Sequence, residues 1–159
     1  MQRTITNQVY LTKPGLSKLQ TELKNLTSSR WPDIVRALRD AASAESTFDN
    51  REYDDLRIEQ ALVEKRITEL RGLLNRAHLV NPTDNDRVSL GNRVKLRFLS
   101  SGAVATYNLV DTHEADPLKR KISDHSPIGR ALLGKKINDE ATVDTGSQRL
   151  RVRVLRISA

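Results

Sequence analysis

The stretch from residue 51 to residue 77 reads REYDDLRIEQALVEKRITELRGLLNRA, and its repeat decides the fold of the first half of the chain. Two interleaved series recur every seven residues: Leu56, Val63, Leu70 and Ala77, and Gln60, Ile67 and Leu74. A heptad repeat with one polar interruption predicts a helix that packs along a narrow apolar seam, as in a coiled coil.

The residues before this helix predict a partner for it. Spacings of three and four place one series on a single helical stripe: Leu16, Leu19, Leu23, Leu26, Ile34, Leu38 and Ala41. Pro32 interrupts the series and predicts a kink or a new first turn. A polar break over residues 43–50 separates the two helical runs. We therefore expect the runs, which extend over residues 14–78, to fold back as an antiparallel hairpin.

The second half of the chain has a different period. After a polar linker at residues 81–86, Val94, Leu96 and Phe98 alternate with charged residues, which is typical of a half-buried strand. Further strands are expected at residues 104–110, 121–123, 141–144 and 150–157. Ser126 and Pro127 predict the N-cap and first position of a short helix that Gly134 ends. The fold class is therefore α+β, with a helical hairpin followed by a small antiparallel sheet.

Composition limits the function classes. The chain has 159 residues, a net charge of +7 and no cysteine, which excludes disulfides and thiolate metal sites. No apolar run is long enough to span a bilayer and the first residues do not resemble a secretory signal, so we expect a cytoplasmic protein. Residues 81–159 carry 14 basic and 9 acidic residues, a net +5. This excess is consistent with a polyanionic partner and equally with a solvated basic surface.

Three segments resemble the Gre transcript-cleavage factor family, the GreA-type transcription elongation factors. They are Asp49–Tyr53, Glu114–Asp116, and Ile122–Ser123 followed by Ser126–Lys135. The resemblance extends over nearly the whole chain. It implies a coiled-coil hairpin (residues 1–80) that enters the secondary channel of RNA polymerase. After the 81–86 linker, it implies an FKBP-like antiparallel β domain with one short helix (residues 87–159) that docks on the polymerase.

The resemblance also implies that the chain is not itself an enzyme. Gre factors stimulate the polymerase's own hydrolysis of backtracked RNA, with tip carboxylates that help hold a shared Mg²⁺, a cation that prefers hard oxygen ligands. Asp49 occupies the second acidic position of the family tip. Ser46 replaces the first acidic residue, and Glu45 stands where the family has glycine. Asp49 is thus the expected catalytic carboxylate and Mg²⁺ ligand, while a compensating role for Glu45 stays open. Without the resemblance, both would be solvated loop residues, with Asp49 an N-cap.

Other roles follow from the same resemblance. Arg57, and Arg51 closer to the tip, are expected to contact the 3′ end of the nascent RNA, although Arg57 could equally pair with Asp54 one turn away. Five residues are expected to contact the polymerase: Asp116, His125, Ser126, Pro127 and Ile128. The three histidines lack metal-ligand spacing, no nucleotide-binding or nucleophile motif is present, and we expect a monomer without a cofactor of its own.

Three functions compete. The first is an elongation factor that stimulates transcript cleavage. The second is a Gre-like regulator or inhibitor that occupies the channel without stimulating cleavage, which the serine at position 46 favours. The third is a general DNA-binding or RNA-binding protein that uses the basic second half, against which the long Ser126–Lys135 match argues.

Overall fold

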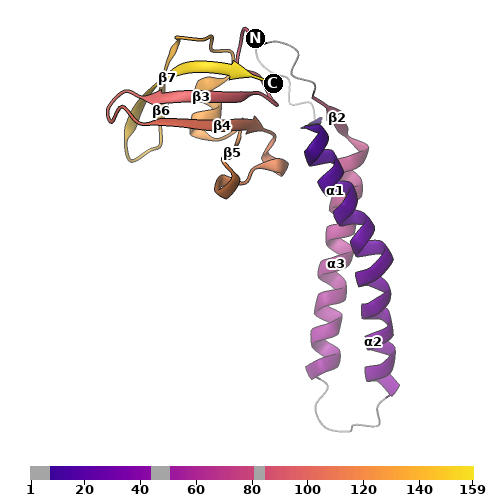
Figure 1. The fold of residues 1–159 in the computed structure, drawn as a ribbon. Helices are drawn as coiled ribbons and strands as arrows, with labels where there is room; N and C mark the ends of the chain where they lie inside the picture. The colour runs from indigo at the N-terminus through magenta and orange to yellow at the C-terminus, as the bar shows by residue number, and fades with distance from the viewer. Residues whose placement is uncertain (1–7, 44–50, 81–84) are drawn as a thin grey trace. The chain divides into compact units, whose positions relative to one another are not determined.

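The computed structural model describes residues 8–43, 51–80 and 85–159, and Figure 1 traces the fold. The chain forms two compact units: one combines Met1–Gly15 with His78–Ala159, and the other is Leu16–Ala77. The predicted tip residues Glu45, Ser46 and Asp49 lie outside the described residues. No described helix is long and apolar enough to cross a membrane.

The second unit is a helical hairpin. Its first arm consists of α1 (Lys13–Asn25, whose first residues belong to the other unit), the π-helical segment η1 (Leu26–Arg30) and α2 (Trp31–Ser43). Its second arm is α3 (Arg51–Asn75), which lies beside α2 (Figure 1). The predicted antiparallel hairpin is therefore present.

Proline explains the interruption in the first arm. Pro32 lies in the first turn of α2 and has no N–H to donate to the π-helical segment that directly precedes this helix. The preceding turn widens to a π-helix, and the hydroxyl of Thr27 donates to the carbonyl oxygen of Leu23 at 2.8 Å. A hydroxyl from the widened turn thus bonds a backbone carbonyl of α1, and side-chain contacts of this kind commonly accompany helix irregularities.

A thin seam joins the two arms. Ile34, Val63 and Ile67 form its buried cluster, with Leu23, Leu26, Trp31 and Leu38 packed partly against it. Outside the seam, Arg66 donates two hydrogen bonds to the Glu22 carboxylate, at 2.7 and 3.1 Å. The hydrogen bond to Glu22 raises the pKa of Arg66 above its usual value. A fork-shaped pair of this kind fixes the arms more specifically than a single contact does.

The other unit carries a five-stranded sheet in the order β5-β4-β3-β7-β6. Its strands are β3 (Arg93–Phe98), β4 (Val104–Val110), β5 (Lys121–Ser123), β6 (Glu140–Asp144) and β7 (Arg149–Ser158). The 3₁₀ turns η2 (Thr112–Glu114) and η3 (Pro117–Lys119) connect β4 to β5. Helix α4 (Pro127–Leu132) covers one face of the sheet (Figure 1).

The core lies between α4 and the sheet. Eleven residues are buried there: Val88, Leu90, Val94, Leu96, Leu109, Leu132, Ala141, Val143, Val152, Val154 and Ile157. Alternation along β3 and β7 sends these apolar side chains to one face and the charged ones to the other. The predicted α+β class is therefore confirmed.

Three details differ from the sequence-based expectation. Ala77 is not the last heptad position of a helix, because α3 ends at Asn75 and Ala77–Leu79 form β2, which pairs with β1 (Val9–Leu11). The sheet is not wholly antiparallel, because β5 runs parallel to β4 after the η2–η3 crossover. Residues 8–15 group with the sheet-bearing unit, whereas the hairpin expected from the resemblance included them within residues 1–80.

Candidate functional site

The segment from Ser123 to Gly129 is built by side-chain hydrogen bonds. Ser126 is the N-cap of α4: its hydroxyl accepts from the N–H of Gly129 at 3.0 Å and donates to the carbonyl oxygen of Ser123 at 2.6 Å. Pro127 follows at the first helical turn, so both predicted positions are confirmed. A Cβ on Gly129 would overlap the Ser123 carbonyl, which explains the glycine. The loop is therefore locked onto the helix.

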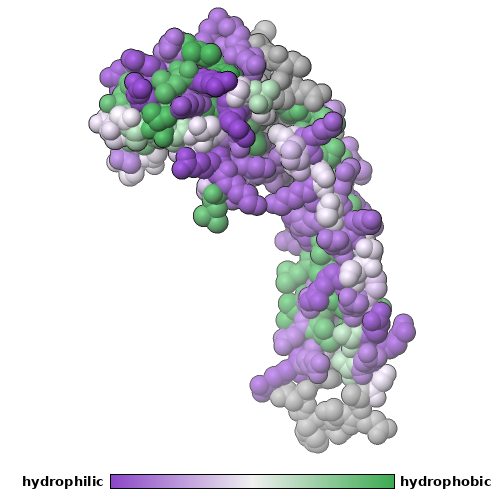
Figure 2. Space-filling model, viewed as in Figure 1, coloured by the Kyte–Doolittle hydropathy of each residue, from purple (hydrophilic) through white to green (hydrophobic). Residues whose placement is uncertain are grey.

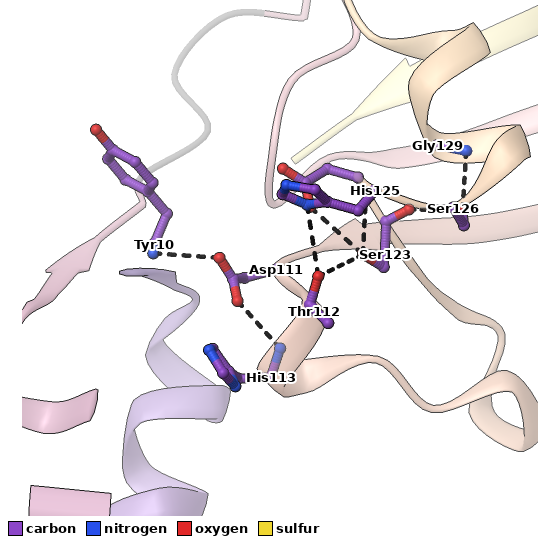
Figure 3. A network of polar contacts seen from close by, with 9 residues as sticks. Tyr10, Asp111, Thr112, His113, Ser123, His125, Ser126 and Gly129 are labelled. Carbon is purple, nitrogen blue, oxygen red and sulfur yellow. Dashed lines mark hydrogen bonds and ion pairs between the residues drawn. The ribbon is translucent and has the colours of Figure 1, made fainter. Parts of the chain in front are cut away.

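His125 is exposed but its ring orientation is fixed. Its Nδ1 lies 2.7 Å from Oδ1 of Asp124, whose carboxylate is buried, while 76% of the His125 side chain is exposed. The His125 backbone N–H donates to the Ser123 hydroxyl at 3.0 Å, and that hydroxyl lies 2.8 Å from the Thr112 hydroxyl (Figure 3). With Nδ1 held by the carboxylate, Nε2 is left for a partner.

Asp116 shapes the neighbouring loop. Its backbone exchanges two hydrogen bonds with Lys121, both at 3.0 Å, and its carboxylate accepts from the N–H of Lys119 at 3.4 Å to cap η3. Arg120 closes the turn in the left-handed conformation, with φ of 53°. The turn presents Leu118, which is 97% exposed.

In the structure, the predicted docking residues lie on the segments that flank β5. Asp116 precedes this strand, and His125, Ser126 and Pro127 follow it. Ile128 differs from the others because it is partly buried and packs against the sheet core. Sequence reasoning missed Leu118, although an apolar residue between Pro117 and Lys119 in a polar loop was the available signal.

Glu114 was noted in the sequence only as part of a family-like segment, and its structural role was missed. Its carboxylate is buried and accepts hydrogen bonds from the backbone N–H and the hydroxyl of Thr12, at 2.5 and 2.6 Å. The Thr12 hydroxyl in turn accepts from the N–H of Gly15 at 3.2 Å. A Cβ on Gly15 would overlap the Glu114 carboxylate. Glu114 therefore positions the residues at the start of α1, where a negative charge is also favoured by the helix dipole.

The expected RNA-contacting residues are both exposed on α3. Arg57 donates to the side-chain oxygen of Gln60 at 3.3 Å, and within the described part of the chain it makes no ion pair with Asp54. The same helix exposes an apolar pair one turn apart, Ile58 at 61% and Leu62 at 62%. Figure 2 shows hydrophobic surface on the α3 side of the hairpin amid mostly hydrophilic side chains. The described residues include no His, Asp and Glu cluster that could hold a metal ion.

Comparison with known proteins covers both units. Residues 9–79 match the family model for the N-terminal domain of transcription elongation factors, and residues 83–159 match the model described as "Transcription elongation factor, GreA/GreB, C-term". The chain belongs to the GreA/GreB family.

Relatives match this family member from end to end. Transcription elongation factor GreA of Mesomycoplasma hyopneumoniae strain 232 is 34% identical over 158 residues, which cover 99% of this chain and 98% of that protein. GreA of Bacillus licheniformis is 37% identical over 150 residues, covering 93% and 95%. Among solved structures, GreA factor homolog 1 (Gfh1) of Thermus thermophilus is 30% identical, with 96% and 99% covered and a TM-score of 0.45.

Proposed function

We propose that this chain is a transcription elongation factor that binds bacterial RNA polymerase and stimulates cleavage of backtracked transcripts. The observation that carries the proposal is the match of both family domains, in order, over residues 9–79 and 83–159. In this proposal it acts in the cytoplasm as a monomer and as an accessory factor, while the polymerase supplies the active site.

The sheet-bearing unit would provide the docking surface. Supporting this, the side chains of Asp116 and Ser126 each cap a turn beside β5, and these hydrogen bonds order the loops that carry Leu118, His125 and Pro127. A surface that is ordered before binding loses less conformational entropy on association. Leu118 supplies the apolar anchor that interface hot spots require, and the His125 ring supplies a directed hydrogen-bonding group.

The hairpin would enter the secondary channel and bring its tip to the polymerase active site. Asp49 contributes a carboxylate, the hard oxygen ligand that suits Mg²⁺, and the bound ion would help activate water for phosphodiester hydrolysis. Glu45 is a second carboxylate near the first acidic position, where the chain has Ser46. Arg57 and Arg51 carry positive charge on the first turns of α3, suited to the phosphates of the RNA 3′ end.

A specific observation favours a second candidate, a channel-binding regulator that does not stimulate cleavage. Ser46 is neutral, and a hydroxyl does not replace the charge of a carboxylate beside a divalent cation. One remaining family carboxylate would then hold the shared ion less well than two. Both candidates share the docking surface and differ only in the chemistry of the tip.

A transcript-cleavage assay on backtracked elongation complexes distinguishes the two. With the full chain added, we expect faster cleavage, and Asp49→Asn should reduce the rate nearly to that without factor while polymerase binding is unchanged. Ser46→Asp should raise the rate, and Glu45→Gln should change it little unless Glu45 compensates for Ser46. Asp55→Asn, which removes an exposed carboxylate from α3 beyond the tip, is the matched control. Tight binding without stimulation, by wild type and Ser46→Asp alike, would leave only the regulator.

A further inference from the structure

One face of the sheet carries an unusual excess of positive charge. On the face opposite α4, charged residues occupy the exposed positions of β3 and β7, and Figure 2 shows hydrophilic surface interspersed with hydrophobic surface over this part of the sheet. The exposed cations there occupy alternate positions of these two strands: Arg93, Lys95, Arg97, Arg149, Arg151, Arg153 and Arg156. Two carboxylates share the face, Glu140 and Asp144 of the adjacent strand β6.

A β-bulge brings the last of these cations onto the face. Arg153 and Arg156 are three residues apart, and strict alternation would send them to opposite sides of the sheet. The register of β7 against β3 shifts so that Lys95 pairs with Arg156 while Leu96 pairs with Val154, leaving Leu155 as the extra residue. The shift keeps Arg156 beside Lys95 on the charged face. Bulges re-aim side chains in this way.

Only three of the seven cations are neutralised within the described part of the unit. Glu140 accepts from Arg153 and Arg151, each at 2.6 Å, and Asp144 accepts from Arg149 at 3.2 Å. The other four form no ion pair with a carboxylate anywhere in residues 8–43, 51–80 and 85–159: Arg93, Lys95, Arg97 and Arg156. Exposed cations left without counter-charges attract a polyanion from solution.

Three of these four unpaired cations converge on one hollow. A surface pocket of about 260 Å³ is lined by Arg93, Lys95, Arg156 and the hydroxyl-bearing residues Thr106 and Ser158. Its lining contains five side chains that can donate hydrogen bonds and no carboxylate. A carboxylate ligand has two oxygens for such a set, whereas a phosphate group has three or four. The donors therefore favour a phosphate.

The surroundings of the pocket extend this preference to a polymer. Arg97 continues the row of cations along β3, and alternate residues of a strand are about 6.8 Å apart. No aromatic side chain lies on this face among the described residues of β3, β4, β6 and β7, because Tyr107 and Phe98 pack against the core. Proteins that hold single strands rely on aromatic stacking, so the face suits a duplex backbone better.

We propose that this face is a binding site for the phosphate backbone of duplex DNA, with the Arg93–Lys95–Arg156 pocket as its central phosphate position. Contacts to phosphate carry no base information, so binding is independent of sequence. This property is separate from the docking on the polymerase that is proposed for the loops around β5. It would hold the factor near DNA wherever polymerase is working.

Fluorescence anisotropy with a labelled 20-base-pair duplex and the full chain tests the proposal. We expect equal affinity for two duplexes of unrelated sequence. The logarithm of the binding constant should fall linearly with the logarithm of the salt concentration, and the gradient of this line is the salt slope. Replacing Lys95, Arg97 and Arg156 with glutamine should weaken binding more than about tenfold at low salt and reduce the salt slope by about 0.9 for each phosphate that is no longer neutralised. The variant Arg97→Lys/Arg156→Lys keeps the charge and should keep the slope. Circular dichroism and thermal melting show whether each variant is folded.

A matched control removes the same charge elsewhere. Replacing Arg87, Lys119 and Lys136 with glutamine takes three exposed cations from outside β3 and β7 and should change duplex affinity at most a few-fold. Two further probes, a 20-nucleotide single strand and poly-glutamate, identify the ligand class. An equal loss of duplex affinity in the Lys95/Arg97/Arg156 variant and in the Arg87/Lys119/Lys136 control would overturn the site. Tighter binding of the single strand than of the duplex would overturn the duplex assignment, and preferential binding of poly-glutamate would show an acidic-protein surface instead.

Discussion

The two units of the molecule are stabilised in different ways. Among its described residues, the hairpin buries six apolar side chains: Leu19, Ile34, Val63, Ile67, Leu70 and Leu73. A forked ion pair between Arg66 and Glu22 also joins its arms. The sheet-bearing unit buries eleven residues between α4 and five strands. A two-helix seam has one apolar stripe on each arm, whereas a sheet covered by a helix encloses its apolar face.

This difference in core size is consistent with different roles for the two units. A hairpin needs only a narrow seam to extend a helical arm, because its backbone hydrogen bonds are satisfied within each helix. The docking role proposed for the loops beside β5 requires an ordered surface, and the caps of η3 and α4 supply side-chain hydrogen bonds that order these turns. Single substitutions in each unit can therefore show whether stability and polymerase binding depend on the two units to different extents.

The largest expected effect is on stability. Leu96 is fully buried in the sheet core, so Leu96→Ala leaves a cavity with little freedom to collapse and should cost about 4 kcal/mol. Ile67 is 8% exposed in the thin hairpin seam, where neighbouring side chains can close over the gap, and Ile67→Ala should cost about 2 kcal/mol.

Hydrogen exchange read by mass spectrometry checks this difference, because peptides from β3 and α3 report the two units separately. Fluorescence of Trp31, the only tryptophan, gives an independent signal from the hairpin. The comparison fails if Ile67→Ala destabilises its unit as much as Leu96→Ala does.

The next effect is on polymerase binding. Leu118→Asp places a charge at the exposed end of η3 and should lower affinity for core polymerase by about tenfold or more, the usual effect of losing an interface anchor. Leu62→Asp makes the same change at an exposed apolar position of α3 and should have a smaller effect. Surface plasmon resonance with immobilised polymerase measures both. A greater loss with Leu62→Asp would move the main docking surface to the hairpin.

A smaller effect is expected from the cap of α4. Ser126→Ala removes the hydroxyl that accepts from the Gly129 N–H, and loss of an N-cap costs about 1 kcal/mol. Ser126→Thr keeps the hydroxyl and should recover most of that stability. Urea denaturation of both variants gives the two values. Equal destabilisation would mean that the β-carbon environment, rather than the hydroxyl, determines the cost.

Local patterns predicted much of this structure. The alternation at Val94 and Leu96 indicated a strand with its correct buried face, and Ser126 with Pro127 indicated the start of α4. These signals work because the residues that cause the structure are adjacent in sequence. The tip and channel assignments depend on the family resemblance and stay predictions.

Apart from Leu118, the features that sequence reasoning missed depend on residues far apart in the sequence or on strand register. Strand β1 pairs with β2 after the whole hairpin intervenes, and Glu114 bonds Thr12 across 102 positions. No local period encodes such partners. The bulge at Leu155 is local, but the sequence alone does not show whether Arg153 and Arg156 lie on the same face of the sheet. The register of β7 against β3 decides this.

The smallest expected effect concerns pH and the charged face of the sheet. Hydrogen bonds from Arg153 and then Arg151 hold the pKa of Glu140 below its ordinary value of 4.5. The unfolded chain therefore binds a proton at this carboxyl more readily than the folded chain does. Its contribution to stability is present above pH 4.5 and is lost as pH falls through the lower folded pKa.

Glu140→Gln removes this linkage, so the variant should lose less thermal stability than wild type between pH 7 and strongly acidic pH. The Glu140 side chain is one-third exposed and its partners Arg151 and Arg153 are 66% and 44% exposed, so solvent screens both ion pairs. The difference in melting temperature should therefore be small and should shrink in high salt. Glu64→Gln is the matched control, because Glu64 forms no ion pair within the described part of the chain. If both variants follow the wild-type pH profile, the Arg151–Glu140–Arg153 cluster does not contribute to folding. The two arginines would then be as available to a polyanion as the four unpaired cations beside them.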